Sequence, residues 1–278
     1  MDQYVVKANG KEEEFSREKL SSSLLKAGAN SEIAASTVSN IEKKFTNYIN
    51  TDEIYHHTLD NLKKVEPIVA LKYTLKRAIM DLGPAGFVFE RYISKILNKY
   101  GYNTEVNKII SGFCVKHEID IIAEKMNERF MVECKYHNAI GIHSDVKITL
   151  YIHSRFLDIE KVGGNKINNE KAFSKAWLFT NTKCTDDAIK YGNCVNLKIT
   201  AWNYPKDESL QYFIENKKLY PLTILSTISG LQKTILFNAG ILLVNELSGY
   251  QINDLANLLS VDKESSAKIL NEVNMLLN

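Results

Sequence analysis

Three acidic residues and a lysine follow a pattern that suits hydrolysis of a phosphodiester bond. Glu133 and Lys135 lie one residue apart at the end of the apolar run 130–132, so in a strand both side chains project from one face. Asp120 lies in an earlier strand-like run, and Glu90 lies in a helical pattern before it. Carboxylates hold hard divalent cations, and a nearby lysine can orient or deprotonate the attacking water. We therefore predict catalytic roles for Glu90, Asp120, Glu133 and Lys135, with Mg²⁺ or Mn²⁺ bound by Asp120, Glu133 and the Cys134 carbonyl.

The order of these residues argues against a chance match. A Glu-x-Lys triplet alone is common, and charged pairs on strands are usually solvated. Here the triplet ends an apolar strand, an acidic strand comes before it, and a Glu-bearing helix comes before both. Glu118, next to Ile119, is assigned to the opposite strand face from Asp120 and is left out of the predicted site.

The stretch from Gly83 to about Val162 resembles the Mrr-like restriction-endonuclease fold of the PD-(D/E)xK type. The resemblance rests on GPAGFVFERYISKIL, VKHEIDIIAEK and VECKYHN. It implies that Asp120, Glu133 and Lys135 are catalytic and that Glu90 is an auxiliary acid. One departure is Ile119, which stands before Asp120 where the family motif has proline.

Several other polar residues near this pattern are open to two interpretations. His117, His137 and His143 are candidates for phosphate contacts or acid catalysis, with His137 favoured, but surface or packing roles explain them equally well. Lys147, Tyr151 and Arg155 share one helical face and suit a stripe facing DNA, or simply a solvated face.

Three segments must position these residues. The first, residues 1–82, contains a hairpin around Asn9-Gly10 and four helical patterns, with Thr51-Asp52-Glu53 capping the third. The second, residues 83–218, alternates helices and strands, and we interpret the ambiguous element Ser144 to Val162 as a helix. The third, residues 219–278, is helical.

The predicted helices of the first segment are Arg17 to Ala27, Ser31 to Tyr48, Asp52 to Lys64 and Ile68 to Met80. The predicted strands of the second are Thr104 to Ile110, Ile119 to Ile122, Arg129 to Cys134, Ala176 to Asn181 and Leu197 to Trp202.

The opening YVVKANGKEEEFSREKL, with the later INTDEIY, resembles the ATP-cone domain, a regulatory module of ribonucleotide reductases and their repressors. The resemblance spans about residues 3 to 82 and departs from the family at Ala8, where arginine is usual. A lysine pair and a helix N-terminus suit a triphosphate. A small helical module without a ligand is the alternative. The resemblance implies that ATP or dATP binds Val5, Lys7, Glu13, Ser16, Lys19, Leu20, Thr51 and Tyr55.

The last segment resembles tandem helix-hairpin-helix modules, through ISGLQKTILFNAGILLVNEL and INDLANLLSVDKESSAKILNEV. That family presents glycine-rich hairpins to DNA phosphates, but here only Gly230 remains and Val261-Asp262 replaces glycine in the second unit. Three lysines against five acids also disfavour strong phosphate binding. Contact with another protein, or dimerisation through Leu255, Leu258 and Leu259, is as well supported as DNA binding.

The composition excludes several classes of protein. The 278 residues are 45% hydrophobic and 24% charged, with a net charge of only +2, so DNA contact requires a local basic surface. The four cysteines form no CxxC pair, and no apolar run has the length of a signal peptide or a membrane span. We expect a cytoplasmic protein with reduced thiols and no structural zinc.

These observations predict an α/β protein: a mostly helical ATP-cone with a small β-hairpin lid, a restriction-endonuclease-like α/β/α core and an all-helical tail. The predicted function is metal-dependent cleavage of DNA, regulated by ATP or dATP, in restriction or defence by a homo-oligomer. The alternative is a non-catalytic nucleotide sensor that binds DNA or sets assembly.

Overall fold

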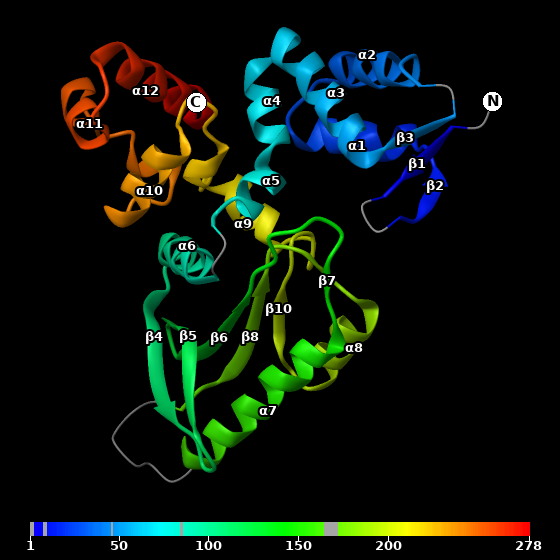
Figure 1. The fold of residues 1–278 in the computed structure, drawn as a ribbon. Helices are drawn as coiled ribbons and strands as arrows, with labels where there is room; N and C mark the ends of the chain where they lie inside the picture. Colours follow the sequence, from blue (N-terminus) through cyan, green and yellow to red (C-terminus); the bar gives the residue numbers. More distant parts are fainter. Residues whose placement is uncertain (1–2, 8–9, 46, 84–85, 164–171) are drawn as a thin grey trace. The chain divides into compact units, whose positions relative to one another are not determined.

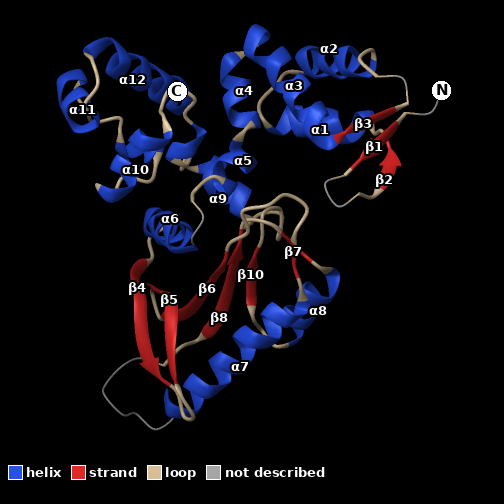
Figure 2. Ribbon diagram, viewed as in Figure 1, coloured by secondary structure: helices blue, strands red, loops and turns tan. Residues whose placement is uncertain are grey.

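The computed structural model describes residues 3–7, 10–45, 47–83, 86–163 and 172–278. Its internal contacts divide the chain into two compact units. One combines Met1–Ile79 with Pro221–Asn278, and the other is Met80–Tyr220. Helices and strands occur together, and the C-terminal region is helical (Figure 2). The predicted mixed α/β class is therefore confirmed, whereas the division into three domains stays a prediction.

A small three-stranded sheet opens the chain (Figure 1). Strands β1 (Tyr4–Val6) and β2 (Glu12–Glu14) form the predicted antiparallel hairpin, with Gly10 at a φ of +79° in its turn. Asn9, which we also assigned to this turn, and Ala8 lie outside the described residues. Strand β3 (Tyr48–Asn50), which the sequence did not predict, pairs in parallel with β1.

Helices bury one face of this sheet. The core contains Val5, Leu24, Ile41 and Leu62, among other apolar side chains. The predicted C-terminal end of the second helix, Tyr48, is wrong. This helix ends at Glu42, and Tyr48 begins strand β3 instead. The helices are α1 (Arg17–Lys26), α2 (Ser31–Glu42), α3 (Thr51–Val65), α4 (Pro67–Tyr73) and α5 (Leu75–Met80).

The N-cap of α3 is Asn50 rather than the predicted Thr51-Asp52-Glu53 run. The Asn50 side chain accepts from the Glu53 amide at 2.8 Å, and Glu53 accepts in return from the Asn50 amide at 3.1 Å. This capping box satisfies two amides that the first helical turn leaves free. Thr51 is the first helical residue, and its hydroxyl donates to the Val6 carbonyl at 3.3 Å.

The second unit contains a five-stranded mixed sheet in the order β10-β8-β6-β5-β4. Strands β4, β5 and β6 pair antiparallel, and β6, β8 and β10 pair in parallel. All five were predicted, with ends that differ by a few residues. They are β4 (Asn103–Ser111), β5 (Lys116–Lys125), β6 (Glu128–Lys135), β8 (Lys175–Thr180) and β10 (Lys198–Thr200).

Strand alternation gives this sheet two apolar faces. Met131, Ala176 and Leu178 pack with Ile152 and Ile159 of helix α7 (Val146–Gly163). Phe130, Trp177 and Phe179 form an aromatic cluster on alternate positions, extended by Phe213. Figure 1 shows α7 running along the sheet. The predicted helix for Ser144 to Val162 is confirmed in type.

Further elements complete this unit. Helix α6 (Gly86–Lys99) packs on β4, β5 and β6, and α8 (Asp186–Cys194) packs on α7 and β10. Residues 84 and 85, in the GPAG stretch where the second predicted segment begins, lie outside the described residues. The remaining elements are α9 (Leu210–Asn216) and a short parallel pair, β7 (His143–Ser144) with β9 (Lys183–Cys184).

The C-terminal region is anchored by a buried carboxylate. Glu272 accepts hydrogen bonds from the amides of Ser226 and Thr227, at 2.9 and 3.0 Å, and from both hydroxyls. Leu255 and Leu259 are buried and Leu258 is half-buried, so their proposed role as a contact between chains is wrong for the first two. The elements are η1 (Leu222–Ile224), α10 (Gly230–Asn238), η2 (Val244–Glu246), α11 (Ile252–Leu259) and α12 (Lys263–Leu277).

Candidate active site

Strands β5 and β6 bring two of the predicted carboxylates together. Their pairing runs from Lys125↔Glu128 to Ile121↔Val132, so Asp120 and Glu133 are the next residues on each strand. The Cys134 amide donates to Asp120 Oδ2 at 2.7 Å, which fixes the Asp120 carboxylate against β6. The antiparallel pairing of β5 and β6 therefore places these acids side by side.

Glu133 is held by an arginine from the helix that covers the sheet. Arg155 Nη1 of α7 lies 2.5 Å from Glu133 Oε2, and both side chains are only 10% exposed. The other carboxylate oxygen, Oε1, is buried and has no hydrogen-bond partner in the described structure. Such an atom costs free energy unless a donor or a cation satisfies it.

Glu90 comes from α6, four residues after the helix begins at Gly86. A Cβ atom at Gly86 would lie 3.4 Å from Glu90 Oε1, an ordinary van der Waals contact, so this carboxylate lies beside the first residue of its own helix. Burial raises the pKa of Glu90 to about 7, with further contributions from the negative charges of Asp120 and Glu118.

The carboxylates disfavour one another's ionisation. Burial raises the pKa of Glu133 to about 8, and the charges of Asp120 and Glu90 add to this against the opposing effect of Arg155. Burial also raises the pKa of Asp120, opposed by its hydrogen bond from Cys134. Each negative charge disfavours the ionisation of its neighbours, because like charges raise one another's pKa. The structure thus brings Glu90, Asp120 and Glu133 into one electrostatic group.

Lys135 ends β6 at the mouth of a pocket of about 230 Å³. The Lys135 side chain is exposed, in contrast to the buried Glu133 two residues earlier. Lys147 and Tyr151 of α7 also line the pocket. The helical face that we interpreted as a stripe facing DNA or solvent therefore borders the site, and Arg155 is buried inside it.

The sequence placed one residue of this site wrongly and did not predict the contact that another one makes. The assignment of Glu118 to the other face was wrong, because residues two apart on a strand share a face, and its charge acts on both Asp120 and Glu90. Arg155 was placed on the correct helical face. What the sequence could not give was that this face turns toward Glu133.

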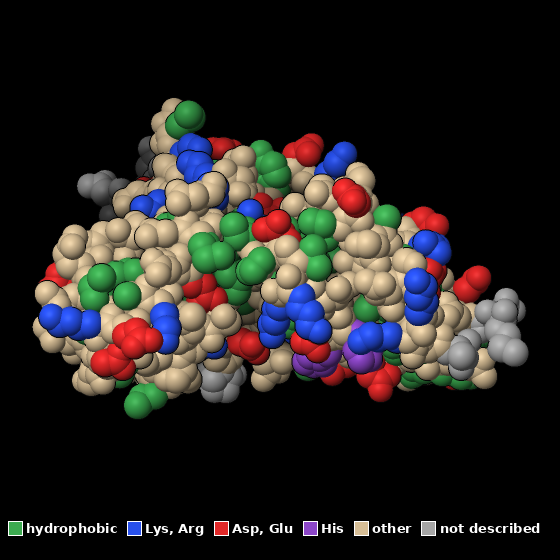
Figure 3. Space-filling model, turned by 90° about the horizontal axis from the view of Figure 1, so that it is seen from above, with side chains coloured by type: hydrophobic (Ala, Val, Ile, Leu, Met, Phe, Trp, Pro, Cys, Tyr) green, Lys and Arg blue, Asp and Glu red, His purple; other side chains and the backbone are tan. Residues whose placement is uncertain are grey.

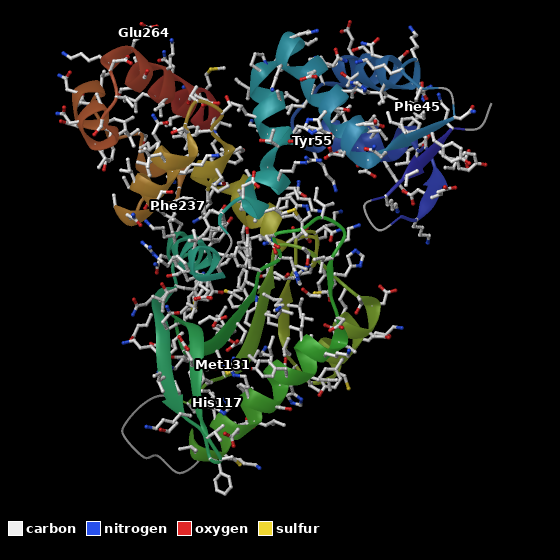
Figure 4. All side chains as sticks on the ribbon, in the orientation of Figure 1. Phe45, Tyr55, His117, Met131, Phe237 and Glu264 are labelled. Atoms are coloured by element: carbon white, nitrogen blue, oxygen red, sulfur yellow. The ribbon has the colours of Figure 1, made fainter. Side chains whose placement is uncertain are left out.

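The three histidines have different environments. His117 of β5 lies 2.8 Å from Asp158 of α7, and Figure 4 labels it beside that helix. His137 Nε2 lies 3.1 Å from the buried Ser144 hydroxyl, which continues to Thr180 at 3.0 Å. Burial and the Lys135 charge lower the His137 pKa. His143 lies on β7 with an exposed side chain.

The carboxylates of Asp120 and Glu133 are the candidate ligands for a divalent cation. Across the described ranges, no three or more His, Cys, Asp or Glu side chains are grouped to hold a metal ion. Mg²⁺, however, is commonly held by one or two carboxylates together with waters and substrate phosphates. The buried, unpartnered Glu133 Oε1 and the adjacent Asp120 meet that smaller requirement.

The predicted nucleotide residues of the first unit gather around Glu13. Its carboxylate lies 2.5 Å from Lys7 Nζ and 3.2 Å from Lys19 Nζ, and these contacts lower the Glu13 pKa. The Ser16 hydroxyl oxygen accepts from the Lys19 amide at 3.1 Å and caps α1. Val5 and Leu20 are buried in the core of this unit.

Tyr55 lies in a second group on α3. The Arg77 guanidinium lies 3.5 Å from the centre of the Tyr55 ring, and the Tyr73 ring stacks on Tyr55 with centroids 5.5 Å apart. Arg77 also pairs with Asp52 at 2.5 Å. Arg77 was not anticipated from the sequence, which contains no local signal linking it to Tyr55.

Comparison with known proteins identifies both ends of the chain. Residues 3–81 match the ATP cone domain, and residues 220–277 match the family described as AF1548-like, C-terminal. The chain is 43% identical to an uncharacterized protein of Archaeoglobus fulgidus over 133 residues, which are 48% of this chain and 71% of that protein. The solved "Protein of Unknown Function AF1548" is 33% identical, with a TM-score of 0.57, over 69% of this chain and 98% of that one.

The N-terminal region is thus an ATP cone, as its residues indicated. The chain belongs to the AF1548-like family. The restriction-endonuclease and helix-hairpin-helix resemblances stay predictions. In the described part of the chain, no helix is both long enough and apolar enough to cross a bilayer.

Proposed function

We propose that this protein is a metal-dependent DNA endonuclease whose activity is regulated by ATP or dATP. The observation that carries the nuclease part is the buried Glu133, with one oxygen unpartnered, next to Asp120 and near Glu90. Placing three mutually repelling carboxylates together costs stability, and such costs concentrate at functional sites. The mixed sheet, with Lys135 at the end of β6, supports the same conclusion.

In this proposal Asp120, Glu133 and the Cys134 carbonyl hold Mg²⁺ or Mn²⁺. A bound cation would supply positive charge to a phosphate oxygen and make water a stronger nucleophile. Lys135 orients the attacking water or takes its proton from the open side of the pocket. Glu90, with a pKa of about 7, can hold or release a proton near neutral pH.

The regulatory part rests on the ATP cone. Lys7 and Lys19 place two ammonium groups around one carboxylate, so a nucleotide phosphate that displaces or joins Glu13 meets both charges. Adenine nucleotide is the ligand that the name of the domain indicates. Restriction or defence against foreign DNA is the setting that the nuclease resemblance suggests.

A non-catalytic nucleotide sensor is the second candidate. It is favoured by the Arg155–Glu133 ion pair, which already neutralises one carboxylate without a metal. In that case the second unit would bind DNA or support assembly, and the carboxylates would have no chemical role.

Plasmid nicking separates the two candidates. We expect cleavage of supercoiled DNA with Mg²⁺ or Mn²⁺, none with a chelator, and a rate that ATP or dATP changes. Glu133→Ala and Asp120→Ala should each abolish cleavage, because each removes a carboxylate ligand. Asp187→Ala, an exposed acid on α8, is the matched control and should cleave at the wild-type rate. Wild-type cleavage by either site variant would show that the site is wrongly assigned.

A further inference from the structure

Arg155 has contacts on three sides that together fix its guanidinium. Nη1 pairs with Glu133 Oε2 at 2.5 Å, and Nη2 donates to the Glu118 carbonyl on β5. The guanidinium also lies 5.3 Å from the centre of the Tyr151 ring, one helical turn away. Arg155 thus bridges α7 to both β5 and β6.

These contacts engage one carboxylate oxygen of Glu133 and leave the other oxygen without a contact to Arg155. Glu133 Oε2 is occupied by the arginine, whereas Oε1 is buried without a partner. A carboxylate that rotated freely would exchange its two oxygens and present neither in a fixed direction. Because Arg155 is itself fixed by the Glu118 carbonyl, the orientation of Glu133 is fixed as well.

We propose that Arg155 is a positioning residue that holds Glu133 Oε2 so that Oε1 is reserved for the divalent cation. This inference rests on the proposed function, since it assigns a role within the same metal site. Arg155 contacts neither the attacked phosphate nor the water in this scheme. Its planar fork suits the task, because a single ammonium group cannot engage the carboxylate and the carbonyl in the same fixed geometry.

The proposal predicts that removing Arg155 changes the affinity for the metal in the direction opposite to the one that simple electrostatics predicts. A guanidinium beside a cation site repels the cation, so if charge were its only effect, removing it would tighten metal binding. If Arg155 positions the ligand, removing it weakens metal binding despite the lost repulsion. The direction of the change therefore distinguishes the two roles.

The test is calorimetric titration of Mn²⁺ into the full chain, without DNA. We expect Arg155→Met to weaken Mn²⁺ binding by tenfold or more, and Arg155→Lys, which keeps the charge but not the fork, to weaken it less. Lys161→Met removes a lysine from the last turn of the same helix and should change the affinity by less than about twofold. Circular dichroism verifies that each variant is folded, and Arg155→Lys preserves the test if Arg155→Met does not fold.

The possible results distinguish a failure of the role proposed for Arg155 from a failure of the nuclease proposal. Unchanged or tighter Mn²⁺ binding by the folded Arg155 variants, with normal binding by the wild type, would overturn the positioning role and leave the nuclease proposal standing. If the wild-type protein neither binds Mn²⁺ nor nicks plasmid DNA, both proposals are wrong.

Discussion

Glu90 illustrates how one carboxyl group links the stability of the fold to pH. In the folded chain its pKa is about 7, raised first by burial and then by Asp120 and Glu118, whereas an unfolded glutamate titrates near 4.5. Between these values the folded state binds more protons than the unfolded state. Its contribution to stability is therefore fully present below about pH 4.5 and is lost as the pH rises through 7.

We predict that Glu90→Gln removes this pH dependence. With a chelator present, the melting temperature of the wild type should fall relative to Glu90→Gln between pH 5 and pH 8. Allowing for solvent screening of a half-buried group, the difference is on the order of 1 kcal/mol, or about 2–4 °C. Differential scanning calorimetry at several pH values measures it, and parallel curves for the two proteins would contradict the assignment.

Gly112 tests the packing of the β4–β5 hairpin against α7. A Cβ atom there would lie 2.1 Å from Asp158 Oδ2 and 2.7 Å from the Val115 carbonyl oxygen. Asp158 cannot move away freely, because it accepts from the Cys114 amide and contacts His117. Gly112→Ala should therefore destabilise the protein by about 1–3 kcal/mol in urea unfolding. Gly249→Ala, where a Cβ atom meets nothing within 4 Å, should be nearly neutral.

At the scale of elements, sequence patterns predicted the elements of the second unit well. Alternating runs gave all five strands of the main sheet, and the uninterrupted run after His143 gave α7. The prediction failed for an element that depends on contacts between segments far apart in the sequence. Strand β3 has only three residues, and its pairing with β1 comes from a segment more than 40 residues away along the chain. A local pattern contains no information about such a partner.

The site shows the same division. The sequence alone predicted the spacing of Glu133 and Lys135, the earlier strand that carries Asp120, and the helix that carries Glu90. The partner of Glu133 was not predicted, since the Arg155 pair depends on how α7 packs across the sheet. Helical periodicity defines which residues share a face, but the packing of the helix decides what that face meets.

A prediction about ATP binding depends on two elements of the ATP cone, the hairpin and α1. Lys7 on the hairpin and Lys19 on α1 meet at Glu13, so neither element alone forms the group. Lys7→Ala should weaken ATP binding tenfold or more, equivalent to about 1.4 kcal/mol. Lys26→Ala, an exposed lysine in the last turn of α1, is the control and should bind normally in the same calorimetric titration. The absence of ATP binding by the wild type would contradict a sensor role.

At the scale of the whole molecule, charge limits how the proposed DNA substrate could be held. The net charge is +2, and on the face drawn in Figure 3 basic and acidic side chains are interspersed. A weak overall field gives little long-range attraction, so the proposed binding of DNA would rely on local groups such as Lys135 and Lys147 at the pocket. We therefore expect a shallow salt dependence, with few phosphates neutralised.

We expect assembly of several chains to connect nucleotide binding to the proposed cleavage of DNA. The chain carries one candidate site, and cutting both strands of a duplex usually needs two. Resemblance to other ATP cones suggests that nucleotide changes how the chains associate. A ligand that binds one assembly state more tightly must shift the population toward that state. Because Leu255 and Leu259 are buried in the chain's own fold, the contact must use other surfaces.

We predict a homodimer or larger species whose size depends on ATP or dATP. Light scattering over a protein dilution series, with and without nucleotide, measures this directly. Lys7→Ala should lose the nucleotide dependence at the same protein concentration, whereas Lys26→Ala should keep it, because only the first removes a proposed phosphate contact. A strict monomer under every condition would contradict the prediction, and single-strand nicking would then be the expected product of the reaction.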